Sequence, residues 1–522
     1  MIEEPIDAFG KDAVRSPVSS PGRMQRLFSG WSASLFQMLL GFTQQVALVP
    51  VFLHFWSGEI LAAWLVIYAI GNLVLIADAG LQFRAINRFL SLKSGADGDG
   101  RTAQYYGALL RVYVCLGVAL AVVVVAASLL VSPSVVFRFP AIADFDAAFM
   151  AVAAGMLLTL PCGLAMGLYR ARGLYGRGVW LQNWGTLIGQ VAQLVAIVLT
   201  GSLLAVAIVY VATQILIAIY LLAIDTRRCF PFLRGAGATP SVRWVIGQFL
   251  KGAPFGISAV TELALVNLPV LLISMLVSDR VAVAQWGLTR VVAGLLRGLC
   301  LQATLPLAAE LGHDHAVGAT DRLRYLYARG SVFVAVLASI VVAGLLPFWE
   351  DFFVLWTHGA IPYDPVLATT LLIGTGAVAP AMLALTYAHY SNRGALLMRA
   401  KALQLAVFLV LSLLLIPRLG PLGAAVAIVA SDLSVQFGVL ASAVLRQTLQ
   451  HPLRHVAFLA SVMGVTTLAG WGLGVAIRSM LPWTGATRIV AECALWLLVV
   501  VMAASPLAIG RVRERLIASI PR

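Results

Sequence analysis

Three charged side chains lie deep inside long apolar segments of this chain. Glu262 stands about ten residues into the segment 252–277, and Arg290 stands about ten residues into the segment 281–308. At about 1.5 Å of rise per helical residue, each charge lies roughly 15 Å from the end of its segment, near the middle of a membrane. Arg297 follows Arg290 by seven residues, which returns to nearly the same helical face. Paired guanidiniums at this depth predict a site for an anion such as a phosphate, because Arg binds phosphate through two parallel hydrogen bonds.

Charges at this depth disfavour insertion by about 2.5–3.5 kcal/mol each, so we expect them to face a watery cavity or one another. One interpretation is that Glu262 and Arg290 form a structural ion pair between helices. The other is a substrate site in which Glu262 holds Arg290 while the site is empty, or carries a coupling proton. A single carboxylate does not balance the charge of two guanidiniums, so the presence of Arg297 favours the interpretation as a substrate site.

Three amide side chains in the first third of the chain are candidate sugar ligands. Gln44 and Gln45 lie in the apolar segment 32–55, and Asn72 lies in the segment 60–81. Each amide can bind a sugar hydroxyl or form a hydrogen bond between neighbouring helices, and the sequence leaves both roles open.

Two further acids lie at or within apolar segments. Asp78 is predicted to fix the end of its segment, with Arg84 or Arg88 as a partner, rather than to bind substrate. Asp432 is a candidate coupling site or a partner for Arg446, and the sequence favours neither role.

The elements that position these residues are predicted to be membrane-spanning helices. The 522 residues are 61% hydrophobic and 11% charged, whereas soluble domains carry about 25% charged residues. We therefore predict an all-α, polytopic membrane protein with fourteen transmembrane helices. The predicted spans are 32–55, 60–81, 107–131, 147–168, 180–200, 203–223, 252–277, 281–308, 330–349, 366–389, 401–416, 421–444, 456–477 and 488–509.

The distribution of Lys and Arg predicts the orientation. Of the 36 basic residues, five lie in the links on one side and three lie within spans, and all others lie on the side of the two termini. The rule that basic residues remain inside predicts cytoplasmic N- and C-termini in a bacterial plasma (inner) membrane. This topology explains the net charge of +14 through contact with anionic membrane lipids and argues against a nucleic-acid partner.

The chain is predicted to contain a duplication with an offset of about 220 residues. Four matches carry it: Trp64 with Trp286, Pro161 with Pro380, 169–173 with 390–394, and 205–209 with 425–429. Six spans per copy place both copies in parallel orientation, with a cavity between two lobes. Tyr68 matches Arg290 and Leu75 matches Arg297, so the cationic face belongs to the second lobe alone and suits one anionic ligand.

The domain organisation follows from this duplication. The predicted parts are a cytoplasmic tail (1–25), an N-lobe of six helices (26–225), a cytoplasmic linker (226–251), a C-lobe of six helices (252–445) and two appended C-terminal helices with the cytoplasmic terminus (446–522). Five scattered cysteines have neither disulfide nor metal spacing, so no metal and no cofactor are expected. Coupling to H⁺, Na⁺ or the membrane potential remains open.

Two stretches carry a family resemblance. The segment 76–82 (IADAGLQ) ends the second span and leads into a basic stretch, and the segment 160–173 holds a Leu-Pro pair and the turn YRARG. Both resemble the Wzx-type polysaccharide flippases of the multidrug/oligosaccharidyl-lipid/polysaccharide (MOP) superfamily. The resemblance implies a transporter that flips an undecaprenyl-diphosphate-type lipid-linked oligosaccharide to the outer leaflet for surface polysaccharide biosynthesis. It also implies polymerase or export machinery as partners.

Three other functions compete with this one. A peptidoglycan-precursor flippase uses a similar cationic cavity, so the sequence distinguishes it poorly from a polysaccharide flippase. A multidrug or cation antiporter of the same superfamily needs an acidic pocket, which the cationic excess here disfavours. A membrane glycosyltransferase or polymerase is disfavoured because the outer links are short, and the close acidic pair of Asp144 and Asp146 is typical of a solvated turn. We therefore do not expect an enzyme.

Overall fold

The computed structural model describes residues 23–78, 80–92, 99–233, 239–391, 393–480 and 485–505, and this part of the chain is helical and without strands. Fourteen helical spans are long and apolar enough to cross a membrane, as predicted. The predicted tail 1–25 lies largely outside the described residues. Several spans consist of consecutive helices; the first, Leu35–Phe55, combines the end of α1 with α2.

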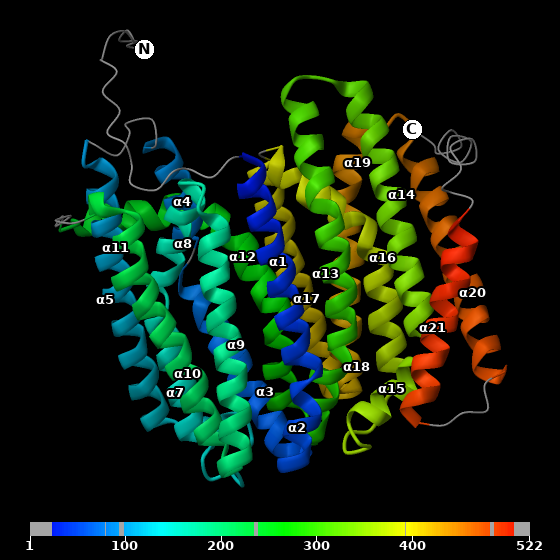
Figure 1. Cartoon of the computed structure of the whole chain (residues 1–522), viewed down its shortest axis with the longest axis horizontal. Coiled ribbons are helices and arrows are strands. Elements are labelled where there is room, and N and C mark those ends of the chain that lie inside the picture. The colour runs from blue at the N-terminus through cyan, green and yellow to red at the C-terminus, as the bar shows by residue number, and fades with distance from the viewer. Residues whose placement is uncertain are drawn as a thin grey trace.

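Six spans form the N-lobe, which occupies the left half of Figure 1. Its elements are α1 (Arg23–Val46), α2 (Leu48–Phe55), α3 (Gly58–Leu73), η1 (Val74–Asp78), α4 (Leu81–Leu92), α5 (Arg101–Leu130), α6 (Pro133–Val136), α7 (Phe145–Leu158), α8 (Pro161–Ala171), α9 (Tyr175–Thr200), α10 (Leu203–Ile219), η3 (Tyr220–Asp225), α11 (Thr226–Cys229) and η4 (Pro231–Leu233).

Six more spans form the C-lobe, and a last pair packs beside it against α14. The C-lobe elements are α12 (Val242–Leu276), α13 (Val281–Ala316), α14 (Thr320–Leu345), α15 (Trp349–Trp356), α16 (Pro365–Tyr390), α17 (Gly394–Leu419), α18 (Pro421–Ser431), η5 (Asp432–Ala441) and α19 (Ser442–Thr448). The last pair is α20 (Pro452–Met480) and α21 (Gly485–Ala504).

Polar side chains at the helix starts explain where several spans begin. Ser57 accepts a hydrogen bond from a backbone N–H of the first turn of α3, and Ser202 does the same for α10. Asp364 accepts two such bonds at the start of α16, where Pro365 occupies the first helical position. These caps satisfy N–H groups that a helix leaves unpaired, so short links can connect long apolar spans.

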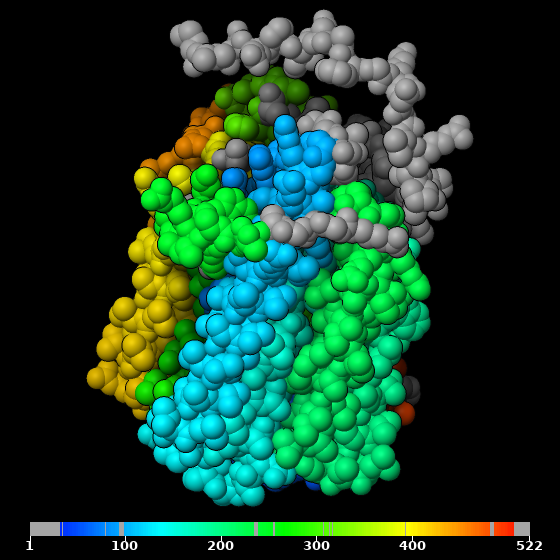
Figure 2. Space-filling view, turned by 90° about the vertical axis from the view of Figure 1, so that its left-hand side faces the viewer, coloured from blue at the N-terminus to red at the C-terminus, as the bar shows by residue number. Residues whose placement is uncertain are grey.

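The outer surface of the bundle is apolar, as a membrane requires. Figure 2 looks onto the N-lobe, with α5 in blue and α10 in green in front and the yellow α17 of the C-lobe beyond them. Val122 and Leu130 on α5 and Leu216 on α10 are exposed. Exposed apolar side chains on this scale mark a surface that contacts lipid, so the chain is a multi-pass membrane protein.

The two lobes meet at both ends of the bundle. At the end that carries α2 and α15 (bottom of Figure 1), Trp64 of the N-lobe and Trp286 of the C-lobe belong to one apolar core. At the opposite end, which carries α4, Gly80 meets the backbone of Gly252 and Gly256 on α12. A Cβ atom at Gly80 would lie 2.5 Å from the Gly252 carbonyl oxygen and the Gly256 nitrogen. Glycine is therefore needed where the lobes touch at the α4 end.

Candidate functional site

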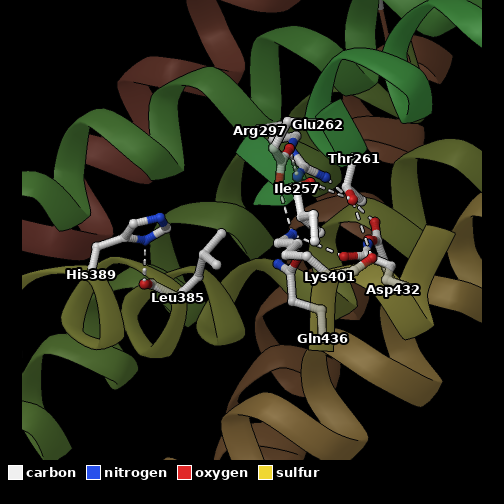
Figure 3. Close-up of polar contacts among 10 residues, drawn as sticks. Ile257, Thr261, Glu262, Arg297, Leu385, His389, Lys401, Asp432 and Gln436 are labelled. Carbon is white, nitrogen blue, oxygen red and sulfur yellow. Dashed lines mark hydrogen bonds and ion pairs between the residues drawn. The ribbon is translucent and has the colours of Figure 1, made fainter. Parts of the chain in front are cut away.

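A partly buried network of charged side chains lies inside the C-lobe, and Glu262 of α12 connects its two cations (Figure 3). Glu262 Oε2 accepts a 2.7 Å hydrogen bond from Arg297 Nη2 on α13, and its Oε1 accepts a 2.6 Å bond from Lys401 Nζ on α17. Arg297 Nη1 also lies 3.5 Å from Asp432 Oδ2 in η5. Four helical elements thus contribute two carboxylates and two cations to one network.

Two glutamines complete the surroundings of the lysine. Lys401 Nζ donates to Gln404 Oε1 at 2.9 Å and to Gln436 Oε1 at 3.1 Å. The Gln404 amide donates to Asp432. Lys401, Gln404 and Gln436 are each 1% exposed. The lysine is therefore enclosed by oxygen acceptors rather than by water.

The local helix geometry brings these groups together. Lys401 and Gln404 are three residues apart on α17 and share a face, while Asp432 and Gln436 are four residues apart at the start of η5. The π-helical turns of η5 begin at Asp432, and such turns are frequent at functional sites. Since two negative and two positive charges balance, the network avoids the uncompensated charge that would be most unfavourable at this depth.

A cavity of about 440 Å³ borders one side of this network. Glu262 and Arg297 line it, with side chains that are 35% and 27% exposed, whereas Lys401 and Asp432 do not. The rest of the wall is mainly apolar and comes from α12, α13, α16, α17 and Phe83 of α4. The polar exceptions include His389, which bonds to the Leu385 carbonyl at 2.9 Å (Figure 3). The cavity thus belongs to the C-lobe, and Phe83 is the one N-lobe side chain among its described lining residues.

Arg290 is not part of the network, although it lies two helical turns from Arg297 on α13. Its Nη1 donates to the Val266 carbonyl of α12, and it interacts electrostatically with Tyr68 of α3. Among the described residues, no carboxylate lies within salt-bridge distance of Arg290. The sequence paired Glu262 with Arg290, but the structure pairs Glu262 with Arg297 and Lys401 instead. The physical reason is the geometry of the hairpin: Glu262 lies 14 residues before the end of α12 and Arg297 lies 16 residues after the start of α13, whereas Arg290 lies only nine residues after it.

Two of the three candidate amides, Gln44 and Asn72, lie close to Tyr68 of α3, which is also near Arg290. Asn72 Nδ2 also donates a 3.5 Å bond to Asn267 Oδ1 of α12. Gln45 is exposed on another side of α1, and no described contact connects it to this group.

The acids predicted at segment ends have structural partners. Asp78 accepts hydrogen bonds from the Tyr113 hydroxyl and, at 3.3 Å, from the Gln82 backbone at the start of α4. It fixes the end of its span as expected, but through Tyr113 rather than Arg84 or Arg88. Asp432 lies beside Arg297 and Gln404 rather than Arg446.

The close acidic pair in the third link also serves the local fold. Asp146 accepts bonds from the Ser134 backbone and hydroxyl at 2.6 and 2.9 Å, and Asp144 accepts a 3.2 Å bond from Ser202. Both carboxylates hold loops at the α15 end of the bundle, where the links are short.

A second cavity, of about 550 Å³, lies inside the N-lobe and has a polar wall. Asp78 and Arg170 contribute charges to it. The neutral polar lining residues are Gln37, Gln82, Thr159, Gln182, Thr186 and Gln214. Nothing in the sequence groups these residues, because they come from four separate helices and the turn between α7 and α8.

Lys401, Gln404 and Gln436 were missed as site residues. Lys401 opens the predicted span 401–416 and was therefore counted with the basic residues outside the membrane. The helix α17 begins at Gly394, so Lys401 lies two turns inside it. The segment 394–400 contains Arg399 and is less apolar than the residues that follow. The boundary predicted from hydropathy consequently falls later than the start of the helix. The one sequence feature that indicates a polar site here is the spacing of Lys401 and Gln404, which places both side chains on one face of a helix.

Comparisons with known proteins define the fold class. No family's sequence pattern matches the chain, and no curated protein matches it in sequence. Among solved structures, it is similar to the lipid II flippase MurJ in an inward closed conformation, with a TM-score of 0.70 and 12% identity over 92% of this chain and 99% of that one.

Two further similar structures are transporters. An inward-facing multidrug resistance MATE family transporter of the MOP superfamily gives a TM-score of 0.61 at 13% identity, over 83% of this chain and 99% of that one. A MATE protein in a bent conformation gives 0.51 at 14% identity, over 84% and 97%. The chain therefore has the MurJ fold over 92% of its length, and the MATE structures share that fold over 83% and 84% of it.

Proposed function

We propose that the chain is a flippase that moves a lipid-diphosphate-linked oligosaccharide across a bacterial inner membrane by alternating access between its two lobes. The observation that carries this proposal is Arg290. It is a guanidinium deep in the bundle, beside the N-lobe, with no carboxylate partner among the described residues. A charge kept uncompensated at this depth is costly unless a ligand of opposite charge binds to it.

The chemistry of the headgroup fits the two arginines of α13. A diphosphate presents several oxygens that a planar guanidinium binds bidentately. Arg290 offers its remaining N–H groups, and Arg297 lies in the wall of the 440 Å³ cavity. The mainly apolar remainder of that wall suits the prenyl chain near the headgroup.

The glycan part requires hydrogen-bonding groups without a large net charge. Gln44 and Asn72 stand beside Tyr68 on the N-lobe side of Arg290. The 550 Å³ cavity of the same lobe adds four glutamines and two threonines. We propose that Gln44, Asn72 and this cavity bind sugar hydroxyls, while Gln45 has no supporting contact.

We propose that the α4 end and both termini face the cytoplasm, because most basic residues lie on that side and basic residues favour the inside. The lobes then open alternately at the α4 and α15 ends. A polymerase or export complex at the outer face is the expected partner. The neighbouring folds are those of transporters, which supports transport rather than enzymatic catalysis.

A peptidoglycan-precursor flippase is the second candidate, because a lipid II flippase gives a TM-score of 0.70 over 92% of this chain. Its substrate also carries a lipid diphosphate, so Arg290 serves both candidates. A multidrug or cation antiporter fits less well. The central network is neutral, and the surplus charge beside it, on Arg290, is positive.

The test is flipping of a lipid-diphosphate-linked oligosaccharide in proteoliposomes that contain the purified protein. Arg290→Ala should abolish flipping at normal protein level, and Arg290→Lys should retain only part of it because ammonium lacks the planar fork. Arg228→Ala removes an exposed arginine and is the matched control. Normal flipping by Arg290→Ala would overturn the proposal. A substrate panel that includes the peptidoglycan precursor separates the two flippase candidates.

A further inference from the structure

We infer that the Lys401 ammonium is a tethered cation: it fills an oxygen-lined cation site in the C-lobe, so the ion-pair network closes without an ion from solvent. The inference goes beyond the proposed function, because it concerns what occupies this site and not which substrate is moved. It addresses the coupling ion, which the sequence left open.

The first argument is the geometry around the nitrogen. An ammonium has three N–H donors, and Lys401 directs them to three oxygens. These oxygens are Glu262 Oε1 at 2.6 Å, Gln404 Oε1 at 2.9 Å and Gln436 Oε1 at 3.1 Å. They come from α12, α17 and η5, so three separate elements converge on one point (Figure 3). Carboxylate and amide oxygens that converge on one point are the ligands that hard cations take.

The second argument is burial. The Lys401 side chain is 1% exposed and Gln404 and Gln436 are equally enclosed. A second carboxylate, Asp432, accepts a hydrogen bond from the Gln404 amide and so lies next to the groups that surround Lys401. Without a cation at this point, Glu262 and Asp432 would share Arg297 alone, and a buried negative charge would remain.

The two oxygens of Glu262 then have different roles. Lys401 donates to Oε1 from the buried side of Glu262, and Arg297 donates to Oε2 from the side that faces the cavity. Only Arg297 of these two cations reaches the cavity. An anionic headgroup can therefore draw Arg297 away while Lys401 keeps Glu262 paired. This consequence rests on the proposed function, whereas occupancy of the site by Lys401 does not.

The experiment asks whether removal of the lysine creates a site for an alkali cation. The purified protein and its Lys401→Met variant are melted in detergent with NaCl, KCl or N-methylglucamine chloride at constant ionic strength. The melting temperature of Lys401→Met should rise with NaCl or KCl and then saturate, because a bound ion stabilises the folded state by mass action. The wild-type protein should melt at one temperature in all three salts.

Two controls define the site. Lys251→Met removes an exposed lysine near the start of α12 and should melt like the wild type in every salt. The double variant Glu262→Gln/Lys401→Met removes the charged ligand and should lose the response to alkali cations. Where Lys401→Met does not fold, Lys401→Gln replaces it, and the wild-type melting temperature is measured in any case.

Two results would overturn the inference. One is a wild-type melting temperature that rises with NaCl or KCl and falls back in Glu262→Gln, since a solvent cation would then occupy the site beside Lys401. The other is a folded Lys401 variant that melts at the same temperature in all three salts. Neither result depends on the transported substrate, so a failed flipping assay and a failed cation site remain distinguishable.

Discussion

Arg290 and Arg297 lie seven residues apart on α13, yet only Arg297 has carboxylate partners among the described residues. Gly294 lies between them on the same face, and a Cβ atom at Gly294 would meet nothing within 4 Å. The helix surface between the two arginines is therefore open at Gly294. Arg297 belongs to the C-lobe network, whereas Arg290 is the arginine that the proposed function assigns to the ligand.

The two arginines should respond differently to truncation. Arg297→Ala removes a cation from the network and should lower the free energy of unfolding by about 1.5–3 kcal/mol, the range for a hydrogen bond to a charged group. Arg290→Ala removes one bond to a backbone carbonyl and should change stability by less. Thermal unfolding in detergent measures both. Equal melting temperatures of the two variants would contradict this division of roles.

The space beside Gly294 is expected to be part of the substrate path. Gly294→Leu should fill the gap between Arg290 and Arg297 and reduce flipping strongly while the protein folds normally. Gly247→Leu is the matched control, because Gly247 lies on α12 with equally open surroundings. Both variants replace a helical glycine, which favours the helix. Undiminished flipping by Gly294→Leu would place the path elsewhere.

Most of the fold was predictable from the sequence because apolar length is a direct physical requirement of a membrane. Each of the fourteen predicted spans overlaps a helical span of the structure. The boundaries differ where a helix extends beyond its apolar stretch. The span predicted from 401 belongs to a helix that begins at Gly394, and the one predicted from 330 begins at Thr320.

The site was only partly predictable, because side-chain partners depend on packing between distant helices. Depth in the membrane identified Glu262, Arg290 and Arg297. It could not show that the partner of Glu262 is Lys401, 139 residues further along the chain. The N-lobe cavity could not be predicted for the same reason, since its four glutamines lie far apart in the sequence and meet only when α1, α4, α9 and α10 pack together.

Glu262 should matter more to stability than any exposed carboxylate. Glu262→Gln leaves Lys401 and Arg297 with Asp432 as their remaining carboxylate, and should lower the free energy of unfolding by about 2–4 kcal/mol. Glu310→Gln is the control, because Glu310 pairs with Arg322 at an exposed site where ion pairs contribute about 0–1 kcal/mol. A melting temperature of Glu262→Gln no lower than that of Glu310→Gln would show that the network does not stabilise the C-lobe.

Closure of the α4 end should depend on Gly80. Its φ is +81°, and a Cβ atom would collide with the α12 backbone. Gly80→Ala should hold the lobes apart at this end and slow flipping. Spin labels at Phe83→Cys and Leu397→Cys, on a background without other cysteines, measure the separation across the cavity.

Gly100→Ala separates backbone strain from lobe contact. Gly100 also has a positive φ, +70°, but its Cβ position is open. The label separation should lengthen in Gly80→Ala and stay unchanged in Gly100→Ala. Identical separations in these two variants would show that the contact at Gly80 does not control closure.

Binding of a short-chain prenyl diphosphate to the purified protein tests the role of Arg290 most directly. The wild type and the Arg228→Ala control should bind with the same affinity, and Arg290→Ala should bind about tenfold or more weakly, equivalent to about 1.4 kcal/mol. The monophosphate should discriminate less between these proteins, because it has fewer oxygens for the guanidinium. Equal affinity of Arg290→Ala and the wild type for the diphosphate would contradict the account.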